Sequence, residues 1–137
     1  MGKPGIHEAL IHLMVVVSTS DHDMTDVEKQ RIDEVVESWP VFEDYRARDL
    51  PAVTISCRKM LGTQQGLQDV FTLARTVIPK RLHDTAYALA VEIAAADMEM
   101  HLEERSVLRL IRENLAIDDA TATAIERATK ARHRTLT

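Results

Sequence analysis

The sequence predicts an all-α protein of one domain, spanning residues 1–137, and three observations support this prediction. Glycine and proline occur only four times each, so few positions interrupt regular structure. Residues that favour helices, chiefly Ala, Leu, Glu and Arg, are plentiful. Apolar residues recur at spacings of three and four, as they do in helices that bury one face. A domain of this length buries roughly two-thirds of the surface that its unfolded chain exposes.

Two helices are expected before the first proline-containing connection. Residues 4–18 form the first, because proline suits a first helical turn. Apolar residues surround this helix almost completely, which is typical of a helix in the middle of a bundle. Residues 26–38 form the second helix, which ends before Pro40. Its inward residues are expected to be Val27, Ile32, Val35 and Val36.

Five further segments complete about seven helices. A looser stretch, "WPVFEDYRARDLP", has room for a short helix and precedes a helix over residues 51–61, with Gly62 as its C-cap. Residues 64–77 form the next helix, and an alanine-rich helix is expected over residues 79–96. The last two helices are expected over residues 102–115 and from Asp118, a good N-cap residue, into the basic end "KARHRTLT". The cations of this end complement the helix dipole.

An internal repeat becomes visible when the chain is shifted by 76 residues without a gap. Its halves cover about residues 6–40 and 82–116. Seven of nine aligned pairs are identical and two exchange Asp for Glu, which helical periodicity alone does not produce. The pairs are His7/His83, Glu8/Asp84, Leu13/Leu89, Val15/Val91, Asp21/Asp97, Asp23/Glu99, Met24/Met100, Glu28/Glu104 and Glu37/Glu113. We expect two helix–loop–helix units about a pseudo-twofold axis, with their central helices crossing antiparallel.

Each half contains an acidic segment, "STSDHDMTDVEK" and "AAADMEMHLEER". Thr25 and Glu28 have the spacing of a capping box, and Glu104 has the same place in the second half. Capping does not account for the remaining acids. With Glu28 and Glu104 they supply three carboxylates per segment, which suits Ca²⁺, Mg²⁺ or Mn²⁺. The candidate metal ligands are therefore Asp21, Asp23, Glu28, Asp97, Glu99 and Glu104.

The alternative to a cation site is a capped acidic turn in solvent, and an EF-hand is excluded. Counted from Asp21, the sixth and twelfth positions hold Asp26 and Ile32 where an EF-hand requires Gly and Glu. His22 could add a nitrogen ligand or lie at the surface, and Glu8 could pair with the histidine one turn later or bind metal. Glu92 interrupts an apolar face, so it either helps to bind a cation or meets a basic side chain.

Several classes of function are not expected. The net charge of −5 argues against nucleic-acid binding. The apolar run near residue 10 is shorter than the roughly 20 residues that span a bilayer, and it lacks the features of a signal peptide. Cys57 is the only cysteine, is expected to be buried, and fits a reducing compartment, so we expect a cytoplasmic protein. No catalytic motif is complete, so an enzyme is not expected.

The acidic segments and the helices before them resemble a known family. "VVVSTSDHDMTDVEK" and "AVEIAAADMEMHLEER" are similar to the paired A-x-A-A-D-G-x-[IVLF]-x-x-x-E segments of the tellurite-resistance TerB and TerB-like family. Where that pattern has glycine after the aspartate, this chain has His22 and Met98.

The resemblance implies an all-helical fold with pseudo-symmetry, a metal site at the six acidic positions and no known enzymatic reaction. It also implies a role in resistance to tellurite and other stresses, within complexes of membrane-associated and calcium-binding Ter proteins. The alternative from another class is a metal-free helical scaffold for protein interactions, whose carboxylates cap helices and face a basic partner.

Overall fold

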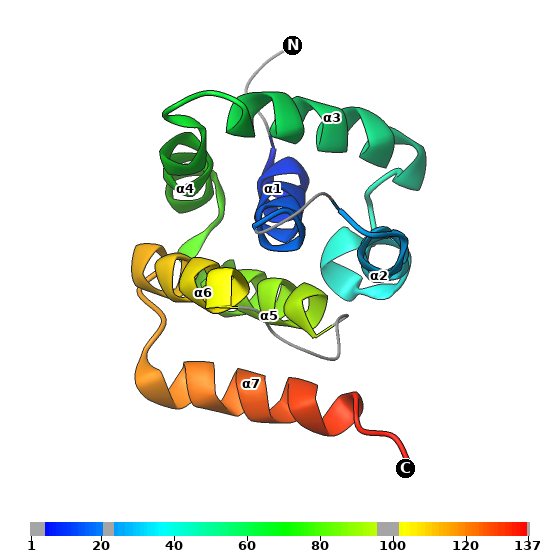
Figure 1. Cartoon of the computed structure of the whole chain (residues 1–137), viewed down its shortest axis with the longest axis vertical. Helices are drawn as coiled ribbons and strands as arrows, with labels where there is room; N and C mark the ends of the chain where they lie inside the picture. Colours follow the sequence, from blue (N-terminus) through cyan, green and yellow to red (C-terminus); the bar gives the residue numbers. More distant parts are fainter. Residues whose placement is uncertain (1–4, 21–23, 96–101, 137) are drawn as a thin grey trace.

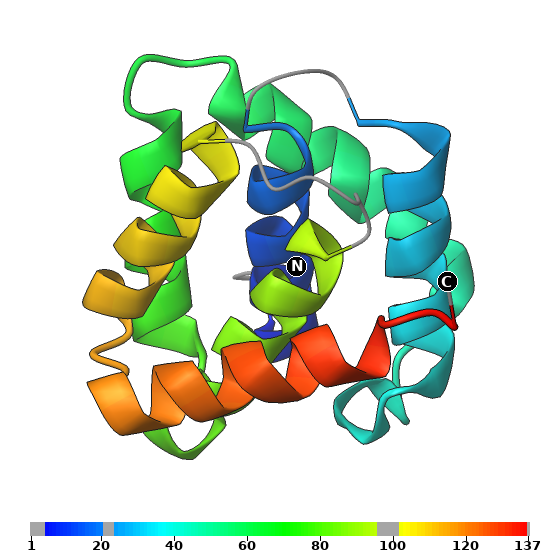
Figure 2. The same cartoon turned by 60° about the horizontal axis from the view of Figure 1, so that its bottom comes forward.

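The computed structural model describes residues 5–20, 24–95 and 102–136, and over these residues the chain is all-α, as predicted (Figures 1 and 2). Seven α-helices and three short 3₁₀ helices form in this part of the chain. They are α1 (Ile6–Ser18), α2 (Asp26–Ser38), η1 (Pro40–Phe42), η2 (Ala47–Asp49), α3 (Leu50–Leu61), α4 (Gly66–Val77), η3 (Lys80–Leu82), α5 (His83–Ala94), α6 (Leu102–Asn114) and α7 (Asp119–Arg132).

Helix α1 lies in the middle of the molecule, as its apolar surface predicts. Every residue from Ala9 to Ser18 is buried, and the helix contacts α3, α4, α5 and α6. Figure 1 shows α1 nearly end-on, with α3 above it, α4 on the left, α2 on the right and α5 below. Such a helix must be apolar all round, because neighbours cover it from every side.

Helix α5 is the second central element and separates α1 from α7. Its alanines are mostly buried, and small side chains allow neighbouring helices to approach closely. In Figure 1, α5 lies across the view while α1 points along it, so the two helices cross steeply. Helix α7 packs on the outer side of α5 and contributes Ala122 to the core.

The structure corrects two expectations from the sequence. Val27 was expected to face inward, but it lies in the first turn of α2 and is 54% exposed. Only Ile32, Val35 and Val36 of that expected face are buried, because the inward position in the first turn of α2 is held by Glu28 and not by Val27. The alanine-rich helix does not begin at Pro79. A 3₁₀ turn over Lys80–Leu82 comes first, and α5 begins at His83 and ends at Ala94.

Two other sequence expectations for this fold are confirmed. Asp118 is the N-cap of α7 and accepts a hydrogen bond from the Thr121 amide at 2.7 Å. Cys57 is fully buried in α3, and burial raises the pKa of its thiol to about 12. No helix in the described part of the chain is long and apolar enough to cross a membrane.

The boundaries of the helices agree with the offset of the proposed repeat. Helices α2 and α6 each have 13 residues, and both of their ends are offset by 76 positions. The ends of α1 and α5 at Ser18 and Ala94 have the same offset. His7 and His83 also play similar parts, since Nε2 of each lies 2.9 Å from a backbone carbonyl, that of Val41 and that of Ile78. The pseudo-twofold relation of the halves stays a prediction.

Candidate functional site

The two acidic segments are connected to helix ends that share one side of the molecule. The end of α1 and the beginnings of α2 and α6 face the viewer in Figure 1 and lie at the top in Figure 2. Five of the predicted site residues fall outside the described residues: Asp21, His22, Asp23, Asp97 and Glu99. Within the described ranges, no three His, Cys, Asp or Glu side chains gather in a way that could hold a metal ion.

Glu28 lies at the third position of α2 and is only 1% exposed. Its Oε1 accepts hydrogen bonds from the backbone amide of Thr25 at 3.0 Å and from the Thr25 hydroxyl at 3.1 Å. In return, the Glu28 amide donates to the Thr25 hydroxyl at 3.1 Å. This is the capping box that the sequence predicts, and it directs the carboxylate back towards the acidic segment rather than into solvent.

Glu104 occupies the equivalent third position of α6 and is fully buried. Helix α6, which contains Glu104, contacts both central helices, α1 and α5. Two carboxylates with the same helical position and nearly complete burial are the clearest parallel between the two halves.

Glu8 and His12 are one turn apart on α1, but their side chains do not form the pair that the spacing allows. Oε1 of Glu8 accepts a hydrogen bond from the Gly5 amide at 3.3 Å at the start of the helix. Nδ1 of His12 instead donates to the backbone carbonyl of Glu8 at 2.6 Å. Burial lowers the pKa of His12, while that carbonyl and the Glu8 charge act in the opposite direction.

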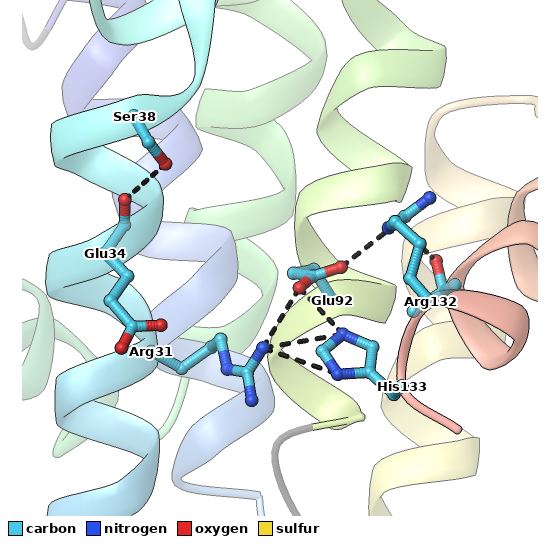
Figure 3. A network of polar contacts seen from close by, with 7 residues as sticks. Arg31, Glu34, Ser38, Glu92, Arg132 and His133 are labelled. Atoms are coloured by element: carbon cyan, nitrogen blue, oxygen red, sulfur yellow. Dashed lines mark hydrogen bonds and ion pairs between the residues drawn. The ribbon is translucent and has the colours of Figure 1, made fainter. Parts of the chain in front are cut away.

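Glu92 meets basic side chains, which is one of the two alternatives that its sequence position left open (Figure 3). Its side chain is 9% exposed and lies on α5 between α2 and α7. Oε1 accepts from Arg132 at 3.0 Å, and Oε2 accepts from His133 at 2.8 Å and from Arg31 at 3.3 Å. Both oxygens are therefore bound by protein groups.

The cations decide the charge state of Glu92. Burial alone would raise the pKa of this carboxyl, but hydrogen bonds from Arg132 and His133, together with their charges, outweigh burial and lower it. Sequence reasoning missed these partners because they lie 40, 41 and 61 residues from Glu92. The available signal was the basic end of the last helix, which was interpreted only as a complement to the helix dipole.

Comparison with known families identifies the chain. The family model described as tellurite resistance protein TerB matches residues 7–128. The chain belongs to the TerB family. Comparisons with curated proteins and with solved structures found no match.

The TerB match places most of the site inside the family domain. It begins in α1 and ends within α7, so it includes Glu8, Glu28, Glu92 and Glu104. Arg132 and His133 lie beyond its end. This TerB-family chain is therefore a helical module of the tellurite-resistance type in which residues after the matched region bind a buried carboxylate inside it.

Proposed function

We propose that this TerB-family module binds divalent cations through its two acidic segments and acts within a larger stress-response assembly in the cytoplasm. The observation that supports the proposal is the burial of Glu28 and Glu104, which are 1% and 0% exposed at equivalent helical positions. A buried carboxylate is costly unless donors or a cation compensate its charge. Each of these two lies within its acidic segment, at the start of the next helix, so all three proposed ligands of a set belong to one short stretch of chain.

The donor chemistry fits a hard cation. Carboxylate oxygens are the preferred ligands of Ca²⁺, Mg²⁺ and Mn²⁺. The capping hydrogen bonds that Glu28 accepts from Thr25 end on its Oε1. The proposed ligands are Asp21, Asp23 and Glu28 in one segment and Asp97, Glu99 and Glu104 in the other.

Three further candidate residues lie outside these two sets of proposed ligands. His22 is a possible additional nitrogen ligand in the first set. Glu8 engages the start of α1 with its Oε1. Glu92 stands apart from the proposed ligands, because its two oxygens bind Arg31, Arg132 and His133.

Metal titration of the full chain tests the proposal. After treatment with a chelator, the protein is titrated with Ca²⁺, Mg²⁺, Mn²⁺ and Zn²⁺ by calorimetry, and its unfolding is measured with and without each metal. A cation at 100 times its Kd stabilises the folded state by about 2.7 kcal/mol. We expect at least one of the first three metals to bind and to stabilise the chain.

Two double variants make the test specific. Asp21→Asn/Asp97→Asn removes the negative charge of one proposed ligand in each segment, whereas Glu43→Gln/Asp44→Asn removes the same charge from exposed residues after η1. Only the first pair is expected to weaken metal binding. Equal responses of the wild type and the Asp21→Asn/Asp97→Asn variant to all four metals would show the proposal to be wrong.

The alternative is a metal-free scaffold for protein interactions. It is favoured by the observation that protein groups already bind Oε1 of Glu28 and both oxygens of Glu92. This function predicts no metal effect in the titration and a basic partner, such as a membrane-associated Ter-type protein, whose binding weakens with added salt.

A further inference from the structure

A groove away from the acidic segments is formed where α2 ends and the chain enters η1 and η2. It has a volume of about 550 Å³, in the range of pockets that hold small ligands. Its apolar lining consists of Val36, Trp39, Pro40, Phe42, Tyr45 and Ala47. We call this set the aromatic groove. It contains three of the five aromatic residues of the chain.

A second, smaller groove shares Trp39 and Pro40 with the aromatic groove. Its volume is about 330 Å³, and it extends to Ala88 on α5 and to Ile125 and Ala128 on α7. Ser38, Trp39 and Pro40 line both grooves, so the two grooves are neighbours. An occupant of the aromatic groove therefore has further apolar surface nearby in the second groove.

The wall of the aromatic groove is held in place by packed rings. The rings of Phe42 and Tyr45 lie 5.9 Å apart between centroids, and the His7 ring lies 5.6 Å from the first and 5.3 Å from the second. These separations are typical of favourable aromatic pairs. His7 also donates to the Val41 carbonyl at 2.9 Å, so α1 supports the turn that carries the rings. A preformed groove loses little entropy when an occupant binds.

The charge around the aromatic groove is negative. Glu37 and Glu43 are exposed and line it, and no Lys or Arg lines it within the described part of the chain. Burial raises the pKa of Tyr45 to about 12, and the negative charges of Asp49 and Glu8 add to this rise. The lining of the aromatic groove therefore combines apolar side chains with two carboxylates.

We propose that the aromatic groove binds a basic apolar peptide segment of a separate protein, with an apolar side chain or proline against Trp39 and a neighbouring Lys or Arg beside Glu37 and Glu43. Charge complementarity selects this occupant, because nucleic acids and anionic membrane surfaces would be repelled. The interaction uses none of the proposed metal ligands. A negative result in the metal titration therefore leaves this proposal standing, and a negative result for peptide binding leaves the proposal of metal binding standing.

Selection from a random-peptide phage library tests the proposal with the full chain as bait. A parallel selection uses the Glu37→Lys/Glu43→Lys variant, in which the charge of the groove is reversed. We expect the wild type to enrich peptides that combine Lys or Arg with an adjacent apolar residue or proline. Enrichment of no peptide over the variant, or of peptides without basic residues, would overturn the proposal.

Affinity measurements with the enriched peptides assign the site. We expect Glu37→Lys/Glu43→Lys to weaken binding by at least about tenfold. The Kd of the wild type should be smaller at low salt than at high salt. The control Asp69→Lys/Glu113→Lys makes the same charge change at exposed positions of α4 and α6, on the opposite side of Figure 1, and should leave the Kd within about twofold. Equal weakening by both variants would show general electrostatic attraction and would overturn the proposed site.

A second copy of the chain is the competing occupant, because its own C-terminal end is basic and carries the fully exposed Leu136. Sedimentation over a range of concentrations separates the two cases. We expect a monomer at every concentration at which peptide binds. Self-association that is abolished by Glu37→Lys/Glu43→Lys would assign the groove to a second copy and overturn the proposal of a separate partner.

Discussion

Glu92 is the residue at which charges from three helices meet. It lies on α5, and its partners Arg31, Arg132 and His133 come from α2, from the last turn of α7 and from the residue after it. The partners are more exposed than the carboxylate, at 25%, 51% and 22% of their side chains. Glu92 is therefore the only one of the four side chains that is nearly completely buried. Loss of a partner would leave its charge buried without full compensation.

The Glu92→Gln variant should lower the free energy of unfolding by about 1–3 kcal/mol at neutral pH. The amide retains the size of the side chain but not the charge that the cations stabilise. The exposed cations can regain water, which keeps the loss below that of a fully buried pair. Urea denaturation measures this difference. The control Glu34→Gln, at an exposed position of α2, should change stability by less than about 0.5 kcal/mol.

The difference between the wild type and Glu92→Gln should depend on pH in one direction. The pKa of Glu92 is lower in the folded state than its usual value, so the unfolded state binds more protons as the pH falls. The contribution of the charge is complete above the ordinary carboxyl range and disappears as the pH falls through the folded pKa. A difference that stays constant down to pH values well below that range would contradict the assignment.

At the residue scale, the sequence predicted features that depend on neighbouring residues better than contacts between residues far apart in the chain. Burial of Cys57 and the capping by Thr25 and Asp118 follow from local chemistry and were predicted. The partners of Glu92 depend on how helices pack, which one sequence does not reveal. Val27 was assigned to the wrong side because an apolar residue was expected at the inward position of the first turn of α2, whereas Glu28 holds that position.

At the scale of elements, the junction of α3 and α4 depends on a close backbone approach. A Cβ atom added at Gly66 would lie 2.0 Å from the carbonyl oxygen of Met60 and 2.8 Å from the Cα of Leu61. Both are backbone atoms and cannot turn away. At Gly62 the nearest atom to an added Cβ, the carbonyl oxygen of Lys59, is 3.4 Å away, and φ is −74°.

These two glycines form a matched pair for substitution. Gly66→Ala should destabilise the fold by at least about 2 kcal/mol, because the end of α3 and the start of α4 must separate. Gly62→Ala should be neutral or stabilising by up to about 1 kcal/mol, since alanine adopts its conformation without strain. Thermal and urea unfolding of both variants checks this, and equal destabilisation would contradict it.

Helix boundaries were predictable where a local signal is strong. Helix α2 begins and ends at the predicted residues because a capping box precedes it and Pro40 follows it. Helix α5 was predicted to begin too early, since proline at a first turn also suits the 3₁₀ turn over Lys80–Leu82 that is observed. Local sequence does not distinguish the two turns, which differ in hydrogen bonding rather than in residue preference.

At the scale of the whole molecule, stability depends on how closely α5 approaches its neighbours. Ala90 is fully buried on this helix. Ala90→Leu should destabilise the protein by about 1–3 kcal/mol, because the core has to expand around three additional carbon atoms. The control Ala124→Leu, at an exposed position of α7, should change stability by less than about 0.5 kcal/mol. Comparable effects of both variants in urea denaturation would contradict tight packing around α5.

The all-α fold was predictable as a whole, but the site was predictable only in part. Composition and periodicity are sufficient for the fold class, and the offset of 76 residues anticipates the equal lengths of α2 and α6. The burial of Glu28 and Glu104 follows neither from their charge nor from their capping positions, which are compatible with exposure. It depends instead on how the helices pack, since α2 contacts α5, and α6 contacts both α1 and α5.

The position of Trp39 gives this molecule a built-in optical reporter. It is the only tryptophan of the chain, and it lines both grooves while packing partly against the core. Its emission wavelength therefore responds to the water around a single known place. A ligand that covers Trp39 will shift the emission to the blue, and loss of the fold will shift it to the red, so occupancy and unfolding can be followed in the same cuvette without a label.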